Sequence, residues 1–176
     1  MTSGKFLAEG ALQTGLEVAW LPSYGPEMRG GTAYCTVVVA DRPIGSPIVN
    51  VPTNILVMNR PSMAKFEFSV KPGGALIINS SLIPDRTSRT DILEVLVPCN
   101  EISIKYTGTS RSANIAGLGA IVGATEMVPK ELVVAFLSGK FKKNPQVLES
   151  NLAIFEESYK IGAQARAAWM AKKGGN

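Results

Sequence analysis

The chain has 176 residues, of which 45% are hydrophobic and 18% are charged, and its formal net charge is +4. This length suits one compact domain, so we expect residues 1–176 to form a single domain of globular rather than disordered character. The Lys and Arg residues are scattered and do not alternate with aromatic residues, which argues against binding to nucleic acid.

Histidine is absent, and the two cysteines, Cys35 and Cys99, lie far apart. These facts exclude, within this chain, a Ser-His or Cys-His catalytic pair, a His-ligated metal and an iron–sulfur cluster or structural zinc site, which need clustered ligands. Two reduced thiols are the favoured interpretation. The longest uncharged apolar run, residues 115–124, is too short to cross a bilayer, and no secretory signal is visible, so we expect a cytoplasmic protein.

In chain order, apolar runs predict strands, and capped or amphipathic segments predict helices between them. The strands are expected at 16–21, 33–40, 55–58, 75–78 and 93–97, and the helices at 2–13, 63–69, 115–124, 130–138 and from 145 onward. Uninterrupted apolar strands alternating with helices indicate an α/β fold. We therefore expect a three-layer α/β/α sandwich with a mainly parallel sheet.

Three segments carry more specific expectations. The β-branched run 36–39 does not alternate, so both of its faces should be covered. Ser62 is the expected N-cap of the helix at 63–69, and Asn144 that of the last helix. Residues 100–106 fit either an alternating strand or a short helix capped by Asn100.

A glycine-rich apolar run follows at residues 115–124. A phosphate-binding turn should stand between a strand and a helix, whereas Gly117, Gly119 and Gly123 lie within the run itself. The glycines therefore predict close helix packing.

The stretch between the first two strands, residues 22–32, combines an unusual backbone with several polar side chains. Its prolines and glycines fix the path of the loop, and loops on a strand scaffold often bind ligands or partners. The candidate ligand-facing or interface residues are Ser23, Tyr24, Gly25, Glu27, Arg29, Gly30, Gly31 and Thr32. The alternative is a loop braced internally by a contact between Glu27 and Arg29.

A second candidate region lies where the strand at 75–78 ends. Asn79, Ser80 and Ser81 follow that strand directly, and open α/β sheets bind ligands at the carboxyl ends of their strands. Asn114 is added to this rim because it stands where the apolar run 115–124 meets the preceding loop. A simple turn made by Asn and Ser residues is the alternative.

Residues 23–32, read Ser-Tyr-Gly-Pro-Glu-Met-Arg-Gly-Gly-Thr, resemble the signature of the gamma subunit of 2-oxoacid:ferredoxin oxidoreductases. The resemblance continues through residues 41–47, 71–74 and 79–81, and resumes near Asn114 and in the last helix. Members of this family begin with a strand and a glycine-rich turn before the first helix, whereas Met1 stands at that helix here. That strand and turn are therefore expected to be missing, and the sequence leaves open whether the start is mis-assigned, the domain is trimmed or another segment fills the gap. The resemblance also favours a helix over residues 100–106.

The resemblance implies a role in a complex rather than a complete active site. Thiamine diphosphate, Mg²⁺ and iron–sulfur clusters would be held by alpha, beta and delta partner subunits, none of them by this chain alone. Coenzyme A would be the co-substrate and ferredoxin the electron acceptor, and the gamma subunit would pack on the cofactor-bearing subunits and shape access for coenzyme A. The reaction would be the oxidative decarboxylation of a 2-oxoacid to an acyl-coenzyme A.

Two other functions stay open at this point. The chain could be a free-standing α/β module that binds a nucleotide or anion, or a purely structural assembly subunit. The sequence does not name the 2-oxoacid, and it leaves open whether the isolated chain forms a homodimer. No nucleic acid and no membrane are expected among its partners.

Overall fold

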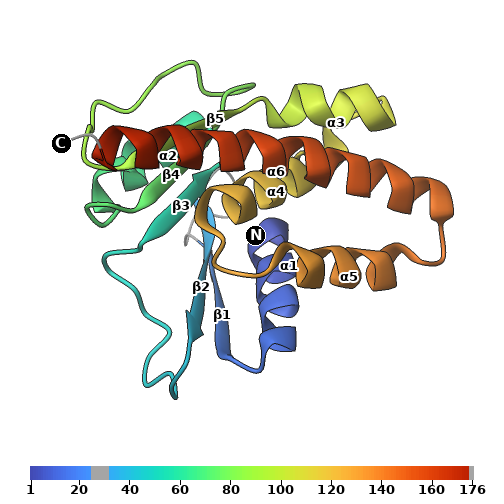
Figure 1. Cartoon of the computed structure of the whole chain (residues 1–176), viewed down its shortest axis with the longest axis horizontal. Coiled ribbons are helices and arrows are strands. Elements are labelled where there is room, and N and C mark those ends of the chain that lie inside the picture. Colours follow the sequence, from blue (N-terminus) through green and yellow to red (C-terminus); the bar gives the residue numbers. More distant parts are fainter. Residues whose placement is uncertain (25–31, 175–176) are drawn as a thin grey trace.

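The computed structural model describes residues 1–24 and 32–174. Each of the five strands predicted from the sequence is present, and helices follow them in the expected order (Figure 1). The strands are β1 (Glu17–Tyr24), β2 (Ala33–Ala40), β3 (Asn54–Val57), β4 (Ala75–Asn79) and β5 (Leu93–Val97). The helices are α1 (Thr2–Ala11), α2 (Arg60–Phe66), α3 (Cys99–Thr107), α4 (Ala113–Thr125), α5 (Lys130–Phe141) and α6 (Pro145–Gly174), with short 3-10 turns at Leu12–Thr14, Glu67–Ser69 and Ser110–Ser112.

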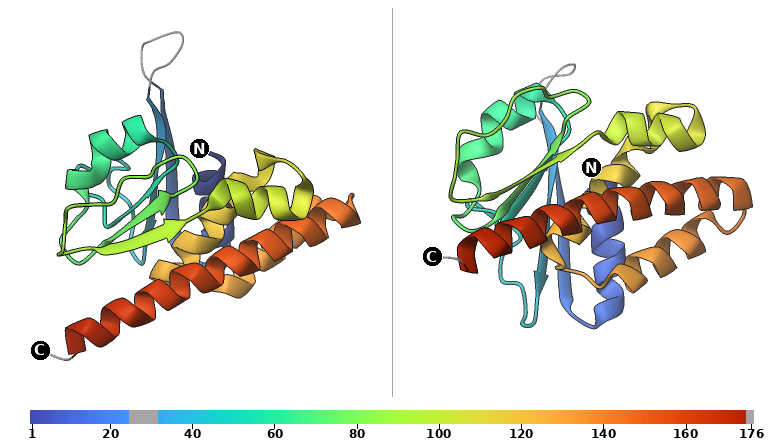
Figure 2. Two further views of the ribbon diagram at one scale, coloured as in Figure 1. Left: turned by 90° about the horizontal axis from the view of Figure 1, so that it is seen from above. Right: turned by 45° about the horizontal axis from the view of Figure 1, so that its top comes forward.

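The main sheet is parallel and has the strand order β3–β4–β5. Leu56 lies opposite Ile77, and Ile77 lies opposite Val95. The central strand β4 is buried along its whole length, as its uninterrupted apolar sequence predicts. Helices α4 and α6 pack on one face of this sheet, with α1, α3 and α5 on the same side, and α2 with segment 82–92 packs on the other face (Figure 2). The predicted three-layer α/β/α architecture is confirmed.

Strands β1 and β2 form a separate antiparallel hairpin in which Trp20 lies opposite Val37. Within the described residues, neither strand is hydrogen-bonded to β3, β4 or β5. One face of the hairpin rests on α1, where Gly4 leaves room for the side chains of Cys35 and Val37. The expectation that residues 36–39 are covered on both faces is wrong. These residues are half-exposed, because the hairpin lies beside the main sheet instead of inside it.

Helix α2 begins earlier than predicted and has a different cap. The side-chain oxygen of Asn59 accepts a hydrogen bond from the backbone N–H of Ser62 at 2.9 Å. Pro61 fits the first turn of a helix, where its missing N–H leaves no hydrogen bond unmade. The prediction that Ser62 caps this helix is therefore wrong, and Asn59 is the cap.

Segment 100–106 is helical. The family resemblance predicted this helix, whereas the alternating apolar pattern favoured a strand. The segment belongs to α3, which begins at Cys99, so Asn100 lies in the first turn and is not the cap. The prediction for the last helix is confirmed, since the side-chain oxygen of Asn144 accepts a hydrogen bond from the N–H of Val147 at 3.2 Å.

Helices α4 and α6 run parallel and pack through glycine. Gly119 of α4 faces the turn of α6 from Phe155 to Ser158, and Gly123 faces the carbonyl of Tyr159. In return, Gly162 of α6 lies against the backbone of Ala120 and Ala124. A methyl group at any of these glycines would fall well inside van der Waals distance of backbone atoms of the other helix. The predicted close helix packing is confirmed.

We expect Gly123→Ala to lower the free energy of unfolding by about 1–3 kcal/mol or more, because the added methyl group would force α4 and α6 apart. Chemical denaturation measures this change. Gly139→Ala in α5 is the matched control, since nothing lies within 4 Å of a methyl group placed there. The control should be neutral or should stabilise the protein by up to about 1 kcal/mol. Equal effects of the two substitutions would contradict the packing described.

A polar contact also joins α3 to α6. The carboxylate of Glu157 accepts hydrogen bonds from Lys105 Nζ and from the hydroxyl of Tyr106, both at 2.6 Å. The hydrogen bond from Lys105, followed by that from Tyr106, holds the pKa of Glu157 below its ordinary value. A carboxyl group whose pKa is lower in the folded chain than in the unfolded chain stabilises the fold at neutral pH. That stabilisation is lost as the pH falls through the folded pKa.

We therefore expect Glu157→Gln to lower the melting temperature at pH 7, with a difference from the wild type that shrinks between about pH 5 and about pH 3. Thermal unfolding over a pH series measures this difference. Glu149→Gln, at an exposed site on the same helix, is the control and should show no such pH dependence. A pH-independent effect of Glu157→Gln would contradict the stated role of its carboxylate.

Candidate functional site

Several elements meet at the carboxyl edge of the parallel sheet. The hydroxyl of Ser3, near the start of α1, donates a hydrogen bond to the carbonyl oxygen of Asn114 in the first turn of α4, at 2.9 Å. Gly117 of α4 lies against Leu56 and Met58, where β3 ends. The amino-terminal ends of α1 and α4 therefore lie together beside the end of β3, at the edge where open α/β sheets bind ligands.

The end of the hairpin lies close to the same edge. The Sγ atom of Cys35 in β2 is 3.7 Å from the carbonyl oxygen of Met1. Ser23 is half-buried at the end of β1, and Tyr24 beside it is 74% exposed. The remaining candidates of the hairpin loop, Gly25, Glu27, Arg29, Gly30 and Gly31, lie outside the described residues, while Thr32 directly precedes β2. The described part thus places Ser23, Tyr24 and Thr32 at one end of the hairpin.

Asn79 is fully buried and joins the end of β4 to the start of α3. Its side-chain amide donates to Oδ1 of Asn100 at 3.1 Å. Its Oδ1 accepts from the backbone N–H of Cys99 at 3.2 Å and from that of Ser81 at 3.3 Å. Its amide group is therefore engaged within the fold.

Ser80 and Ser81 lie at the surface of this junction and are half-exposed. The N–H of Ser80 donates to the carbonyl of Val97 at 2.9 Å and so extends the ladder between β4 and β5. The hydroxyl of Ser81 accepts from the N–H of Asn100 at 2.9 Å and donates to the carboxylate of Glu101. The rim candidates 79–81 therefore surround the first turn of α3.

Asn114 occupies a different part of the edge. It is half-buried in the first turn of α4 and contacts α1 through Ser3. The structure thus divides the predicted rim into two groups, one around α3 and one at the junction of α1 and α4.

The sequence did not predict a group of aromatic and cationic side chains near the end of the hairpin. The ring of Tyr34 in β2 packs on that of Phe66 in α2, with centroids 5.2 Å apart. Lys65 Nζ lies over both rings, at 5.5 Å from the centroid of Tyr34 and 5.3 Å from that of Phe66. Lys65 and Tyr34 are 31 positions apart, and no local pattern connects them. The ammonium group of Lys65 is thus held beside the end of the hairpin by cation–π attraction to two partly exposed rings.

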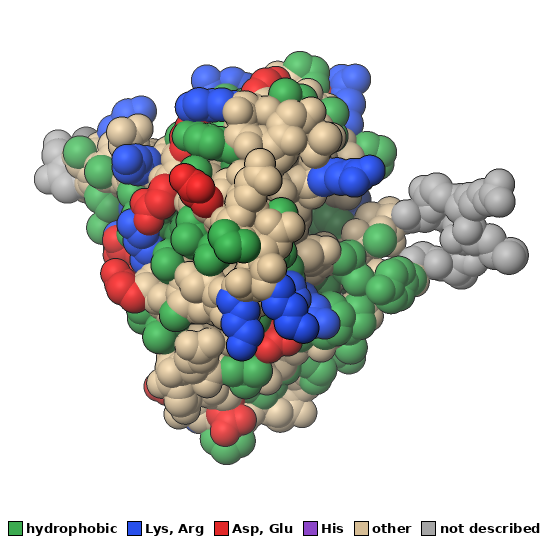
Figure 3. Space-filling model, turned by 90° about the vertical axis from the view of Figure 1, so that its right-hand side faces the viewer, with side chains coloured by type: hydrophobic (Ala, Val, Ile, Leu, Met, Phe, Trp, Pro, Cys, Tyr) green, Lys and Arg blue, Asp and Glu red, His purple; other side chains and the backbone are tan. Residues whose placement is uncertain are grey.

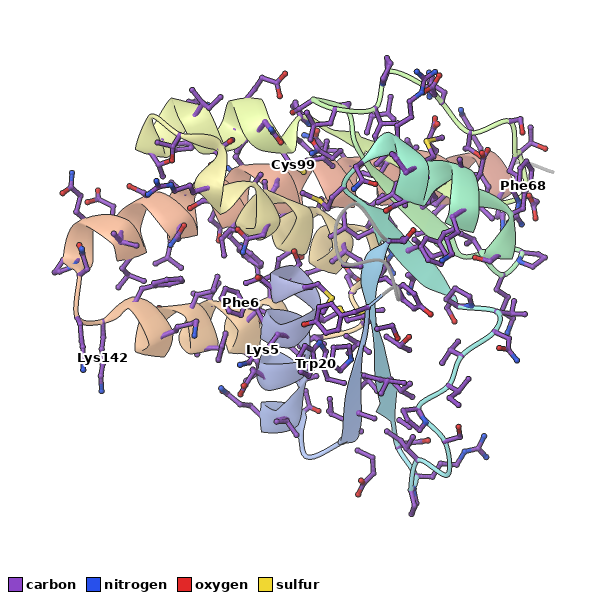
Figure 4. All side chains as sticks on the ribbon, turned by 180° about the vertical axis from the view of Figure 1, so that it is seen from behind. Lys5, Phe6, Trp20, Phe68, Cys99 and Lys142 are labelled. Carbon is purple, nitrogen blue, oxygen red and sulfur yellow. The ribbon has the colours of Figure 1, made fainter. Side chains whose placement is uncertain are left out.

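The two cysteines are free thiols that lie in different places. Cys99 is buried at the start of α3, where burial raises its pKa to about 12 (Figure 4). Cys35 is half-buried on the hairpin. Over residues 1–24 and 32–174, no three or more Cys, Asp or Glu side chains are grouped so that they could hold a metal ion. In the same residues, no helix combines the length and the apolar character that crossing a membrane requires.

A shallow pocket of about 240 Å³ opens at the opposite, amino-terminal edge of the sheet, between Gly73 and the end of α6. The cation in its wall, Arg166, is paired with Glu126. The ring of Trp169 is covered by Lys173 Nζ at 4.7 Å from its centroid. The charged groups of this pocket are thus engaged with each other or with neighbouring residues.

The fold and the edge define an α/β domain whose carboxyl edge carries two helix amino termini and the end of a hairpin. The family model described as pyruvate ferredoxin/flavodoxin oxidoreductase matches residues 1–161. The chain belongs to this family.

Two relatives show how such a domain occurs in proteins. The chain is 34% identical over 161 residues to the ketoisovalerate oxidoreductase subunit VorA of Methanothermobacter marburgensis, a match that covers 89% of this chain and 32% of VorA. It is 28% identical over 155 residues to the 2-oxoglutarate synthase subunit KorC of Methanocaldococcus jannaschii, covering 88% of this chain and 82% of KorC. The chain therefore spans about a third of VorA and most of KorC.

Solved structures share the fold. The gamma subunit of a keto/oxoacid ferredoxin oxidoreductase from Geobacter sulfurreducens has a TM-score of 0.74 at 23% identity, covering 95% of this chain and 90% of that one. The 2-oxoglutarate:ferredoxin oxidoreductase from Magnetococcus marinus, solved with 2-oxoglutarate, coenzyme A and succinyl-CoA bound, has a TM-score of 0.79 at 22% identity. That match covers 92% of this chain and 28% of the other. The predicted family and fold class are confirmed.

We expect Asn79→Ala to lower the free energy of unfolding by about 2–3 kcal/mol, because it leaves buried partners at the start of α3 without hydrogen bonds. Urea denaturation measures this change. Ser80→Ala, at the half-exposed neighbouring position, should change the free energy of unfolding by less than about 0.5 kcal/mol. A loss of stability in Ser80→Ala as large as that in Asn79→Ala would contradict the assigned role of Asn79.

Proposed function

We propose that this chain is the gamma subunit of a multi-subunit, thiamine-diphosphate-dependent 2-oxoacid:ferredoxin oxidoreductase. The observation that carries the proposal is the family match over residues 1–161, together with similarity to most of the length of KorC, which is itself a subunit. The complex would convert a 2-oxoacid, coenzyme A and oxidised ferredoxin into an acyl-coenzyme A, carbon dioxide and reduced ferredoxin. The complex would be cytoplasmic.

Alpha, beta and delta subunits would hold thiamine diphosphate, Mg²⁺ and the iron–sulfur clusters. The thiols among the described residues of this chain do not fit an iron–sulfur cluster. Iron–sulfur clusters are held by several cysteine thiolates, whereas Cys99 is buried with a raised pKa and Cys35 lies apart from it on the hairpin. The contribution of this chain would therefore be to bind and to orient.

The proposed ligand- or partner-facing surface is the end of the hairpin. Its candidate residues are Ser23, Tyr24, Gly25, Glu27, Arg29, Gly30, Gly31 and Thr32, with Asn79, Ser80, Ser81 and Asn114 as the adjoining rim. Tyr24 supports this proposal because a phenol that is 74% exposed is available for contact. Arg29 supports it by its chemistry, since a guanidinium donates two parallel hydrogen bonds to a phosphate or carboxylate. Coenzyme A carries phosphate groups that such a side chain would bind.

Among the rim residues, those at the surface are better placed for binding than the buried one. Asn79 is engaged with Cys99, Ser81 and Asn100, which favours a role in positioning the start of α3. Ser80 and Asn114 retain partial exposure. Lys65, beside Tyr34 and Phe66, adds a cation near the hairpin end that would assist an anionic ligand.

A purely structural role is the second candidate, and one observation favours it. Apolar side chains that are partly exposed are concentrated on the hairpin and on the segment after it. An assembly subunit would need such a surface even if it touched no ligand.

We expect Arg29→Ala to raise the Michaelis constant for coenzyme A by roughly tenfold or more in the assembled complex, because it removes a charge-assisted hydrogen bond. Steady-state reduction of ferredoxin at varied coenzyme A concentrations measures this effect. Native mass spectrometry of the same samples reports assembly. Lys142→Ala, which removes an exposed cation in the turn between α5 and α6, is the control and should leave both measurements unchanged.

The possible results for Arg29→Ala distinguish the ligand-binding role from the purely structural role. Weakened assembly with normal kinetics in the complex that remains would favour the structural role. Unchanged assembly together with unchanged kinetics would contradict the proposed role of Arg29 altogether.

A further inference from the structure

Exposed apolar side chains are unevenly distributed over the chain. Among the described residues, fourteen large hydrophobic side chains are exposed, and eight of them lie between residues 16 and 51. These eight are Leu16, Trp20, Leu21, Tyr24, Tyr34, Ile48, Val49 and Val51. The hairpin and the segment that follows it thus hold more than half of them, which is typical of an interaction surface.

The register of the hairpin separates its two faces. Trp20 and Val37 lie on the face that meets α1, and Figure 4 shows Trp20 beside that helix. The outer face is formed by four cross-strand pairs, which are Glu17 with Ala40, Ala19 with Val38, Leu21 with Thr36, and Ser23 with Tyr34. Tyr34 packs on Phe66 of α2, while Leu21 is exposed and Val38 is half-exposed. The outer face is therefore a mixed sheet surface whose apolar side chains, among them Leu21, Tyr34 and Val38, are partly exposed.

This surface also carries few charges. The charged residues of the two strands and of the segment to residue 53 that the structure describes are Glu17, Asp41 and Arg42, all at the foot of the hairpin. The opposite end of the molecule, formed by α3 and the turn between α5 and α6, carries many Lys, Arg, Asp and Glu side chains (Figure 3). Lys142 projects outward there (Figure 4). Depletion of charge is typical of the buried centre of a stable protein interface.

The energetics of a hairpin also favour a partner on this surface. A two-stranded ribbon is marginally stable in water, and it needs a further strand or a packed apolar face to be held firmly. Helix α1 supplies this cover on the inner face. On the outer face, Tyr34 packs on Phe66 of α2 at one end. A partner seated on this face would bury side chains that are now half-exposed.

The relatives indicate what the partner is. In VorA, the part that matches this chain is 32% of the polypeptide, so about two thirds of VorA is additional chain joined to the domain. KorC, by contrast, is matched over 82% of its length. Where the domain is a separate chain, a counterpart of the rest of VorA would have to associate with it non-covalently. A lasting contact of that kind requires an apolar surface.

We propose that the outer face of the hairpin, with Ile48, Val49 and Val51, is the docking surface for one partner, the separate chain that corresponds to the remaining two thirds of VorA. The proposal rests on the proposed function, because it takes the chain to be a subunit of such a complex. Beyond the proposed function, this inference names the surface through which the subunit binds its partner. The charged end of the molecule, at α3 and α5, would lie outside that contact.

The test measures the affinity of the full chain for that partner, co-produced from the same organism, by analytical ultracentrifugation. The double variant Ile48→Asp with Val51→Asp should weaken binding tenfold or more, because a carboxylate would be buried in an apolar contact. Both side chains are largely exposed in the isolated chain, at 70% and 60%, so the melting temperature should stay within a few degrees of the wild type. Ile104→Asp on α3, where the side chain is 50% exposed, is the matched control and should bind as the wild type does.

The outcomes separate this inference from the proposed function. If the wild-type chain does not bind the partner, both are overturned. If the wild type binds and the double variant binds equally well, the proposed function stands and the docking surface is wrong. Weaker binding by Ile104→Asp alone would place the contact at the opposite end of the molecule. If the double variant instead abolishes self-association of this chain, the surface serves a second copy and the proposal fails.

Discussion

The close contact between α4 and α6 is the constraint on which the rest of the structure depends. Glycine at 119, 123 and 162 lets the two helix backbones approach where any side chain would collide with them. This contact holds α4 flat on the parallel sheet, with its first turn beside the end of β3. The hydrogen bond from Ser3 to Asn114 then joins α1 to the same place, and α1 supports the hairpin. The candidate site and the hairpin are thus positioned by a helix–helix contact that contains none of the candidate site residues.

The polar residues at the carboxyl edge fall into two classes by their hydrogen bonds. Asn79 and Ser81 are hydrogen-bonded to the start of α3 and so join β4 to that helix. Tyr24 and Lys65 remain available to a ligand or partner near the hairpin end. A hydrogen-bonded edge beside an exposed hairpin is the part of the chain that the proposed complex would use. That the chemistry lies on partner subunits stays a prediction.

Much of the fold could be predicted from local patterns. Runs of mainly apolar residues predicted every strand, and glycines inside an apolar helix predicted the contact of α4 with α6. The errors arose where tertiary position overrides pattern. The pattern of residues 36–39 predicted a buried strand, but these residues lie at the margin of the fold. Ser62 was predicted to cap α2, but the side chain of Asn59 caps it instead. The partnership of Asn79 with Asn100 and that of Lys65 with Tyr34 join residues far apart in sequence, so no local pattern could reveal them.

The most direct test of the central claim is purification of the tagged chain from its native host, followed by native mass spectrometry and assays for thiamine diphosphate and iron. If the chain is a subunit of the proposed oxidoreductase, we expect a complex much larger than the 18.7 kDa chain, with both cofactors present. A single chain or homo-oligomer that contains neither cofactor would contradict the assignment as a subunit, while leaving the α/β/α fold unchanged.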